Sequence, residues 1–121
     1  MNRIELEIKP IPSPRLTRQG RFTKRAIRYY KYKDTIALLC KTAGFELSES
    51  HSITFYIPLP KSISKKEKQR RLDIGKHQLR PDLDNLTKAV WDALLEEDGN
   101  VYKVTLQKYW AEKGKIVIEN L

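Results

Sequence analysis

The chain has 121 residues, of which 40% are hydrophobic and 32% are charged, so it suits one small domain with a modest core. The frequency of aromatic and aliphatic residues excludes a disordered chain. Lys and Arg outnumber Asp and Glu by 24 to 15, and this net charge of +9 indicates a polyanionic partner. No apolar run approaches the roughly 18 residues of a membrane span, and the N-terminus lacks a signal-peptide pattern. We therefore expect a cytoplasmic protein with no membrane partner.

Cysteine and histidine form no metal-ligand pattern. The single cysteine, Cys40, excludes an internal disulfide and a cysteine-based zinc site, and its apolar surroundings predict a buried side chain. His51 and His77 are isolated in the sequence, so we expect each to be a surface or loop residue and not a ligand.

The first predicted element is a strand over residues 3–9, where apolar and charged residues alternate. An extended basic loop over 10–23 follows, since three prolines and a glycine interrupt any regular pattern. From about Lys24, apolar residues recur at spacings of three and four, which predicts a helix that ends at Gly44.

The middle of the chain predicts a strand and two helices. Alternation over 52–59 predicts the strand. Ser64 and Glu67 form a capping-box pattern, which favours a short helix from 65 to about 73. A clean apolar stripe then predicts a buried amphipathic helix over about 85–95.

Two final strands, over 101–110 and 115–119, are expected to join through Gly114 as a hairpin. Residues 1–121 therefore form a single α+β domain, a mixed sheet of about four strands packed with two main helices.

Charge is unevenly distributed along the chain. Residues 61–80 carry 8 basic and 2 acidic side chains, whereas residues 81–121 carry 5 basic and 8 acidic ones. An acidic segment within a basic protein suits a site that holds divalent cations against phosphates.

Asp82 and Asp84 lie two residues apart just before the predicted central helix. In an extended segment their side chains point the same way and can converge on one cation, and carboxylate oxygens suit Mg²⁺ or Mn²⁺. Lys88 is one helical turn beyond Asp84 and can hold a phosphate or a leaving oxygen. Asn85 can orient a ligand, and the acidic group at 96–98 can complete the site.

These residues also have a purely structural interpretation. Asp84 is a good helix cap, Asp84 and Lys88 make an ordinary i,i+4 pair, and basic residues often form a solvated face. A cation site in a basic protein instead fits phosphodiester hydrolysis. A metal lowers the pKa of bound water and stabilises charge on the attacking and leaving oxygens.

The stretch from Arg80 to Leu94 contains Asp-x-Asp-Asn-x-x-Lys followed by Asp-Ala-Leu, and resembles the signature of the RusA family of Holliday-junction resolvases. The similarity extends over most of the chain, including Pro12–Arg15 and the basic stretch Ser62–Lys66. It implies a small, Mg²⁺-dependent, homodimeric endodeoxyribonuclease of bacteria and prophages. Such an enzyme resolves four-way junctions by paired hydrolysis in DNA recombination and repair.

The resemblance also implies residue roles. Asp82 and Asp84 match the family's metal-binding aspartates, and Lys88 matches the lysine that assists catalysis. Asp98 matches a third carboxylate and metal ligand, with Glu97 as the runner-up. The connection after the helix is shorter than the family's, so Asp98 reaches the pair only if the helix ends early, if the chain turns back at once, or across a dimer interface.

Phosphate contacts are expected from the two basic segments. The expected DNA-binding residues are Arg15, Arg18, Arg21, Lys24, Lys65, Lys66, Arg70, Arg71, Lys76 and Arg80. The competing function is a branched-DNA-binding module of the same fold that does not cut.

Overall fold

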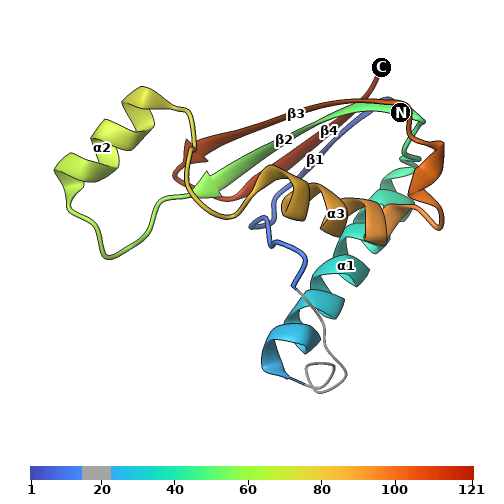
Figure 1. Cartoon of the computed structure of the whole chain (residues 1–121), viewed down its shortest axis with the longest axis horizontal. Coiled ribbons are helices and arrows are strands. Elements are labelled where there is room, and N and C mark those ends of the chain that lie inside the picture. Colours follow the sequence, from blue (N-terminus) through green and yellow to red (C-terminus); the bar gives the residue numbers. More distant parts are fainter. Residues whose placement is uncertain (15–22) are drawn as a thin grey trace.

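The structure is a computed structural model that describes residues 1–14 and 23–121. The expected DNA contacts Arg15, Arg18 and Arg21 lie outside the described residues. The described chain forms an α+β domain in which helices α1 (Lys24–Ala43) and α3 (Leu83–Leu94) cover one face of a four-stranded mixed sheet (Figure 1).

The helices and strands follow in the predicted order. The strands are β1 (Arg3–Leu6), β2 (Ser50–Pro58), β3 (Lys103–Ala111) and β4 (Lys115–Asn120), and the helices are α1 (Lys24–Ala43), α2 (Lys65–Ile74) and α3 (Leu83–Leu94). A 3₁₀ turn, η2 (Asp98–Asn100), follows α3. Strand β1 ends earlier than predicted, because the N–H of Ile8 donates to the carbonyl of Leu6 and the chain turns away.

The sheet has the order β1-β4-β2-β3, with β2 and β3 parallel and the other pairs antiparallel. The predicted hairpin between the last two strands is therefore wrong, because β2 lies between them. Gly114 is required for a different reason: a Cβ there would lie 2.6 Å from the Cα of Lys9. The β3–β4 connection thus packs against the segment after β1.

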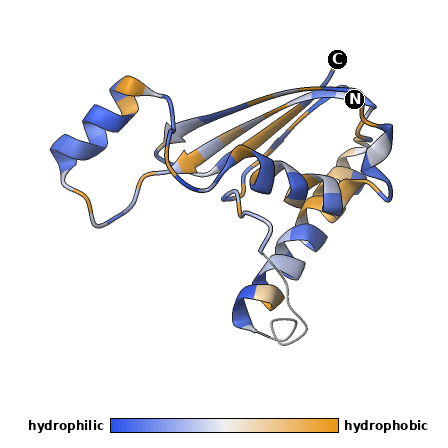
Figure 2. Ribbon diagram, viewed as in Figure 1, coloured by the Kyte–Doolittle hydropathy of each residue, from blue (hydrophilic) through white to orange (hydrophobic). Residues whose placement is uncertain are grey.

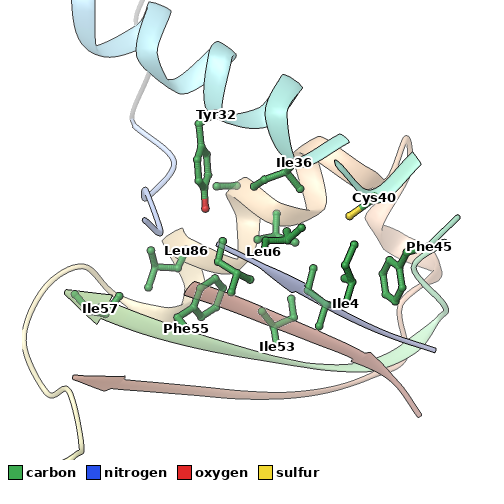
Figure 3. Close-up of a cluster of buried hydrophobic side chains, with 14 of the residues drawn as sticks. Ile4, Leu6, Tyr32, Ile36, Cys40, Phe45, Ile53, Phe55, Ile57 and Leu86 are labelled. Atoms are coloured by element: carbon green, nitrogen blue, oxygen red, sulfur yellow. The ribbon is translucent and has the colours of Figure 1, made fainter. Parts of the chain in front are cut away.

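The core lies between the sheet and helices α1 and α3 (Figure 3). Central strand β2 sends alternate side chains into it, and α1 and α3 bury one stripe each, as their periodicity predicts. Fully buried members include Leu6, Ile36, Ile53, Phe55, Leu86 and Ile118. The predicted burial of Cys40 is confirmed, and it raises the pKa of the thiol to about 11.

Helix α2 projects away from this core, and every one of its residues is at least partly exposed. Figure 2 shows it as largely hydrophilic. Ser64 caps the helix as predicted, accepting the N–H of Glu67 at 3.1 Å. The Glu67 carboxylate accepts hydrogen bonds from Arg70 and Arg71.

Both histidines are buried, so the expected surface position is wrong for each; His77 does lie in a loop, between α2 and α3, whereas His51 lies in a strand. His51 lies on the core face of β2, where its Nε2 accepts the indole N–H of Trp91 at 3.0 Å. The ring of His77 packs against Trp110, with centroids 4.2 Å apart. Each histidine is at least 33 residues away in sequence from its tryptophan partner, so local sequence patterns could not predict these contacts.

Candidate active site

The N-terminal end of α3 carries both predicted metal ligands. Asp82 occupies the N-cap with an extended backbone, and it makes no side-chain capping bond in the part of the chain that the structure describes. Asp84 lies in the first helical turn, where its Oδ1 accepts the N–H of Asn85 at 2.9 Å. Both aspartates are exposed, and the helix dipole stabilises negative charge at this end.

This geometry corrects two expectations about the pair. Helix α3 begins at Leu83, two residues earlier than predicted, so the interpretation of Asp84 as the cap is wrong. Only Asp82 has the extended backbone that was expected for both residues. The two aspartates stand at the N-cap and in the first turn of the same helix.

Lys88 pairs forward along α3, with its Nζ 3.4 Å from Oδ1 of Asp92. The other oxygen of Asp92 accepts the hydroxyl of Tyr29 on α1 at 3.1 Å. Burial is the main cause that raises the pKa of Tyr29, and Asp92 adds to it, so the phenol remains a donor. The Lys88 side chain is 58% exposed, which leaves its ammonium accessible from solvent.

A cleft of about 620 Å³ opens beside Asp82. Arg80 lines it, as do Lys9 from the segment after β1 and Arg25 from the first turn of α1. Ile57 places the cleft at the carboxyl end of β2. The sequence alone did not indicate Lys9 and Arg25, because only the packing of three distant segments brings them to one hollow.

The segment before the undescribed residues is fixed against the same helix end. The N–H of Ser13 donates to the carbonyl of Asn85 at 3.0 Å. Ser13 also contacts Tyr29, whose pKa it lowers in opposition to burial. Ser13, which lines the cleft, is therefore held by both α1 and α3.

Asp98 begins the 3₁₀ turn η2, which follows the opposite, C-terminal end of α3. A helix of 12 residues rises about 18 Å, and the few residues between Leu94 and Asp98 cannot return that distance. The structure therefore does not bring Asp98, or Glu97 beside it, to Asp82 within one chain. Among the described residues, no group of three or more His, Cys, Asp or Glu side chains could hold a metal ion.

Two carboxylates nevertheless fit a magnesium site. Mg²⁺ is commonly held by one or two carboxylates together with water and substrate phosphates. Asp82 and Asp84 provide exposed hard oxygen ligands, and Asp82 lines the cationic cleft. The donor set thus suits Mg²⁺ or Mn²⁺ and does not suit zinc.

The expected DNA-binding residues fall into two groups. Most of the described ones have exposed side chains: Lys24, Lys65, Lys66, Arg70, Lys76 and Arg80. Arg71 differs, since its side chain is 19% exposed, pairs with Glu67 and lies 4.7 Å over the ring of Trp110. Arg71 therefore attaches α2 to β3. Arg70 and Arg71 hold the pKa of Glu67 at about 2.

Comparisons with known proteins identify the family. In the described residues, no helix is both long enough and apolar enough to cross a bilayer. A comparison with curated proteins gave no match. A family model described as endodeoxyribonuclease RusA matches residues 5–119. Because this match spans nearly the whole chain and includes the Asp82–Lys88 motif, the chain belongs to the RusA endodeoxyribonuclease family.

Proposed function

We propose that this protein is a metal-dependent, structure-selective endonuclease that resolves four-way DNA junctions. The observation that carries the proposal is the pair Asp82 and Asp84 at a helix start beside a cleft lined by cations. Membership of the RusA family supports DNA hydrolysis. We also propose that the enzyme selects junctions and uses Mg²⁺, with Mn²⁺ as a substitute. Its role is in DNA recombination and repair in the cytoplasm.

The cleft residues bind and orient the DNA strand. Lys9, Arg25 and Arg80 neutralise backbone phosphates and hold one of them beside Asp82. Asp82 and Asp84 hold the cation, which when bound supplies Lewis-acid stabilisation of charge on phosphate oxygens. The cationic lining also offsets the repulsion between these carboxylates and the DNA.

Lys88 stabilises negative charge that develops on the reacting phosphate. Its ammonium is exposed, and Asp92 limits its movement from one turn further along α3. Because the hydroxyl of Tyr29 holds Asp92 in turn, helix α1 supports the position of Lys88. A preorganised cation of this kind lowers the barrier without rearranging during the reaction.

A homodimer supplies two matching sites for the two symmetric strands of a junction. Since Asp98 lies at the far end of α3 from Asp82, its role as third carboxylate requires a second copy of the chain. We therefore include in the proposal that Asp98 acts across the dimer interface.

One observation favours a second candidate, a module that binds branched DNA without cutting it. The described chain places two carboxylates, and not three, at the α3 N-terminus. If no partner completes the site, the basic surface still binds DNA.

The deciding experiment compares a synthetic four-way junction with a linear duplex of the same arms, each incubated with Mg²⁺, Mn²⁺ or EDTA. The proposal expects paired, symmetric nicks in the junction with either metal and none with EDTA. Tight junction binding without nicks at any metal concentration would establish the binding module, and equal cutting of the duplex would refute structure selectivity.

A further inference from the structure

The segment that leads into α3, residues 75–82, is attached to β3 in its first half. The carbonyl of Gly75 accepts the N–H of Trp110 at 2.8 Å. The N–H of His77 donates to the carbonyl of Lys108 at 3.2 Å. These two main-chain bonds pair residues 75–77 with the edge of β3.

The second half of the segment is held by one side chain. The ammonium of Lys108 donates to the carbonyls of Leu79 at 2.5 Å and Pro81 at 2.6 Å. Pro81 directly precedes Asp82, so this contact lies one peptide away from the first metal ligand. Leu79 and Pro81 also flank Arg80, whose side chain lines the cleft.

The position of Lys108 on β3 explains why it can reach these carbonyls. It pairs in register with Phe55 of β2, whose side chain is fully buried, so Lys108 points to the helix-covered face of the sheet. From this face its ammonium reaches the carbonyls of the segment before α3. Burial lowers the pKa of Lys108, and the nearby carboxylate of Asp82 opposes that shift.

The arrangement brings the positive Lys108 ammonium to the backbone directly before the negative Asp82 carboxylate. Hydrogen bonds from an ammonium are stronger than those between neutral groups. Two such bonds to carbonyls that are two residues apart restrict the backbone between them. Outer groups that orient metal ligands commonly contribute 10- to 100-fold to metal affinity or activity.

We propose that Lys108 is a positioning residue, whose ammonium clamps the Leu79 and Pro81 carbonyls and so presents Asp82 to the metal and Arg80 to the cleft. Its role in metal binding rests on the proposed function. The clamp itself is a property of the metal-free protein, which allows the two to be tested separately.

The test compares Lys108→Met and Lys108→Arg with the wild type. Methionine keeps the stem and removes the ammonium, whereas arginine keeps two or more donors. Lys103→Met is the matched control, since Lys103 is an exposed lysine at the start of the same strand. The measurements are hydrogen exchange of the metal-free protein, Mn²⁺ affinity by electron paramagnetic resonance, and junction cleavage as a function of Mn²⁺ concentration.

In Lys108→Met we expect the amides of His77 and Leu86, which donate to the carbonyls of Lys108 and Asp82, to exchange at least about ten-fold faster while β2 and α1 remain protected. Mn²⁺ affinity should fall on the order of ten-fold, and excess Mn²⁺ should restore most of the cleavage rate. Lys108→Arg should stay within about three-fold of the wild type, and Lys103→Met should be indistinguishable from it.

Unchanged exchange and unchanged Mn²⁺ affinity in Lys108→Met would overturn the proposal. So would faster exchange across the whole sheet, which would mean that Lys108 supports the fold in general. If the wild type neither binds Mn²⁺ nor cuts DNA, the proposed function fails, and exchange at the His77 and Leu86 amides still decides whether the clamp exists.

Discussion

The indole Nε1 of Trp91 donates to Nε2 of His51 across 3.0 Å, and this bond joins α3 to β2. The other ring nitrogen of His51, Nδ1, lies 2.9 Å from the carbonyl of Ser48. The imidazole is therefore held neutral, with Nδ1 as the donor and Nε2 as the acceptor. Burial is the main cause that lowers its pKa, although the bond to Ser48 opposes the shift.

Stability should fall as the pH drops from about 7.5 to 5.5. The pKa values of His51 and His77 are lower in the folded protein than their ordinary value of 6.5. As the pH falls through 6.5, the unfolded chain therefore binds protons before the folded protein does. The stability that is fully present above pH 6.5 is lost as the pH falls below that value. We expect a loss on the order of 1 kcal/mol, measured as a shift in urea midpoint. His51→Gln should reduce this pH dependence, with His77→Gln removing the remaining share. Identical pH profiles in the wild type and the double variant would contradict the assignment.

Asp82→Asn and Asp84→Asn should each reduce junction cleavage by at least about a thousand-fold, because each removes a charged metal ligand. Junction binding should be unchanged or tighter, since a repulsive charge near the phosphates is lost. Gel-shift titration and single-turnover cleavage separate the two effects. Lys88→Ala should lower turnover more than affinity. Equal losses of binding and cleavage in all three variants would assign them a structural role.

Lys9→Gln and Arg25→Gln should each weaken junction binding by roughly 1 kcal/mol, about five-fold, because each removes a cation from the cleft beside Asp82. Fluorescence anisotropy at fixed salt provides the measurement. Lys41→Gln is the matched control, since Lys41 is exposed in the last turn of α1 and away from the cleft. An equal loss in all three variants would show that only net charge matters.

The exposed cations of α2 should determine much of the salt dependence of junction binding. Affinity falls as salt rises, and each phosphate contact contributes roughly 0.9 to the steepness of this fall on a log–log plot. Replacing Lys65, Lys66 and Arg70 with Ala should make the slope shallower by about three. Arg71→Ala should instead reduce stability and leave the slope nearly constant, because Arg71 packs on Trp110. An unchanged slope in the triple variant would place the DNA on another surface.

Mixing the Asp82→Asn protein with the Asp98→Asn protein should restore cleavage if Asp98 acts from the partner copy. Each variant alone should be inactive, and a mixed dimer recovers one intact site in which both carboxylates are native. About half of the dimers at equal ratio are mixed by random pairing, so nicking of one strand per junction is expected. Full activity of Asp98→Asn alone would remove Asp98 from the site, and sedimentation as a monomer would refute the dimer.

The sequence by itself predicted the type and order of the elements, because each has a strong local signal. Alternation marked the strands, Gly44 marked the end of α1, and Ser64 marked the start of α2. The motif at Asp82–Lys88 likewise indicated the family and a candidate site, since its residues are contiguous and lie at one helix start.

Only the tertiary structure decided which distant segments meet. Strand β2 lies between β3 and β4, pairing in parallel with the first and antiparallel with the second, and no local sequence pattern predicts which strand edges pair. For the same reason Lys9 and Arg25 enter the cleft, and Lys108 reaches the carbonyls before Asp82. The length of α3 separates Asp98 from Asp82, since a rigid helix keeps its two ends about 18 Å apart.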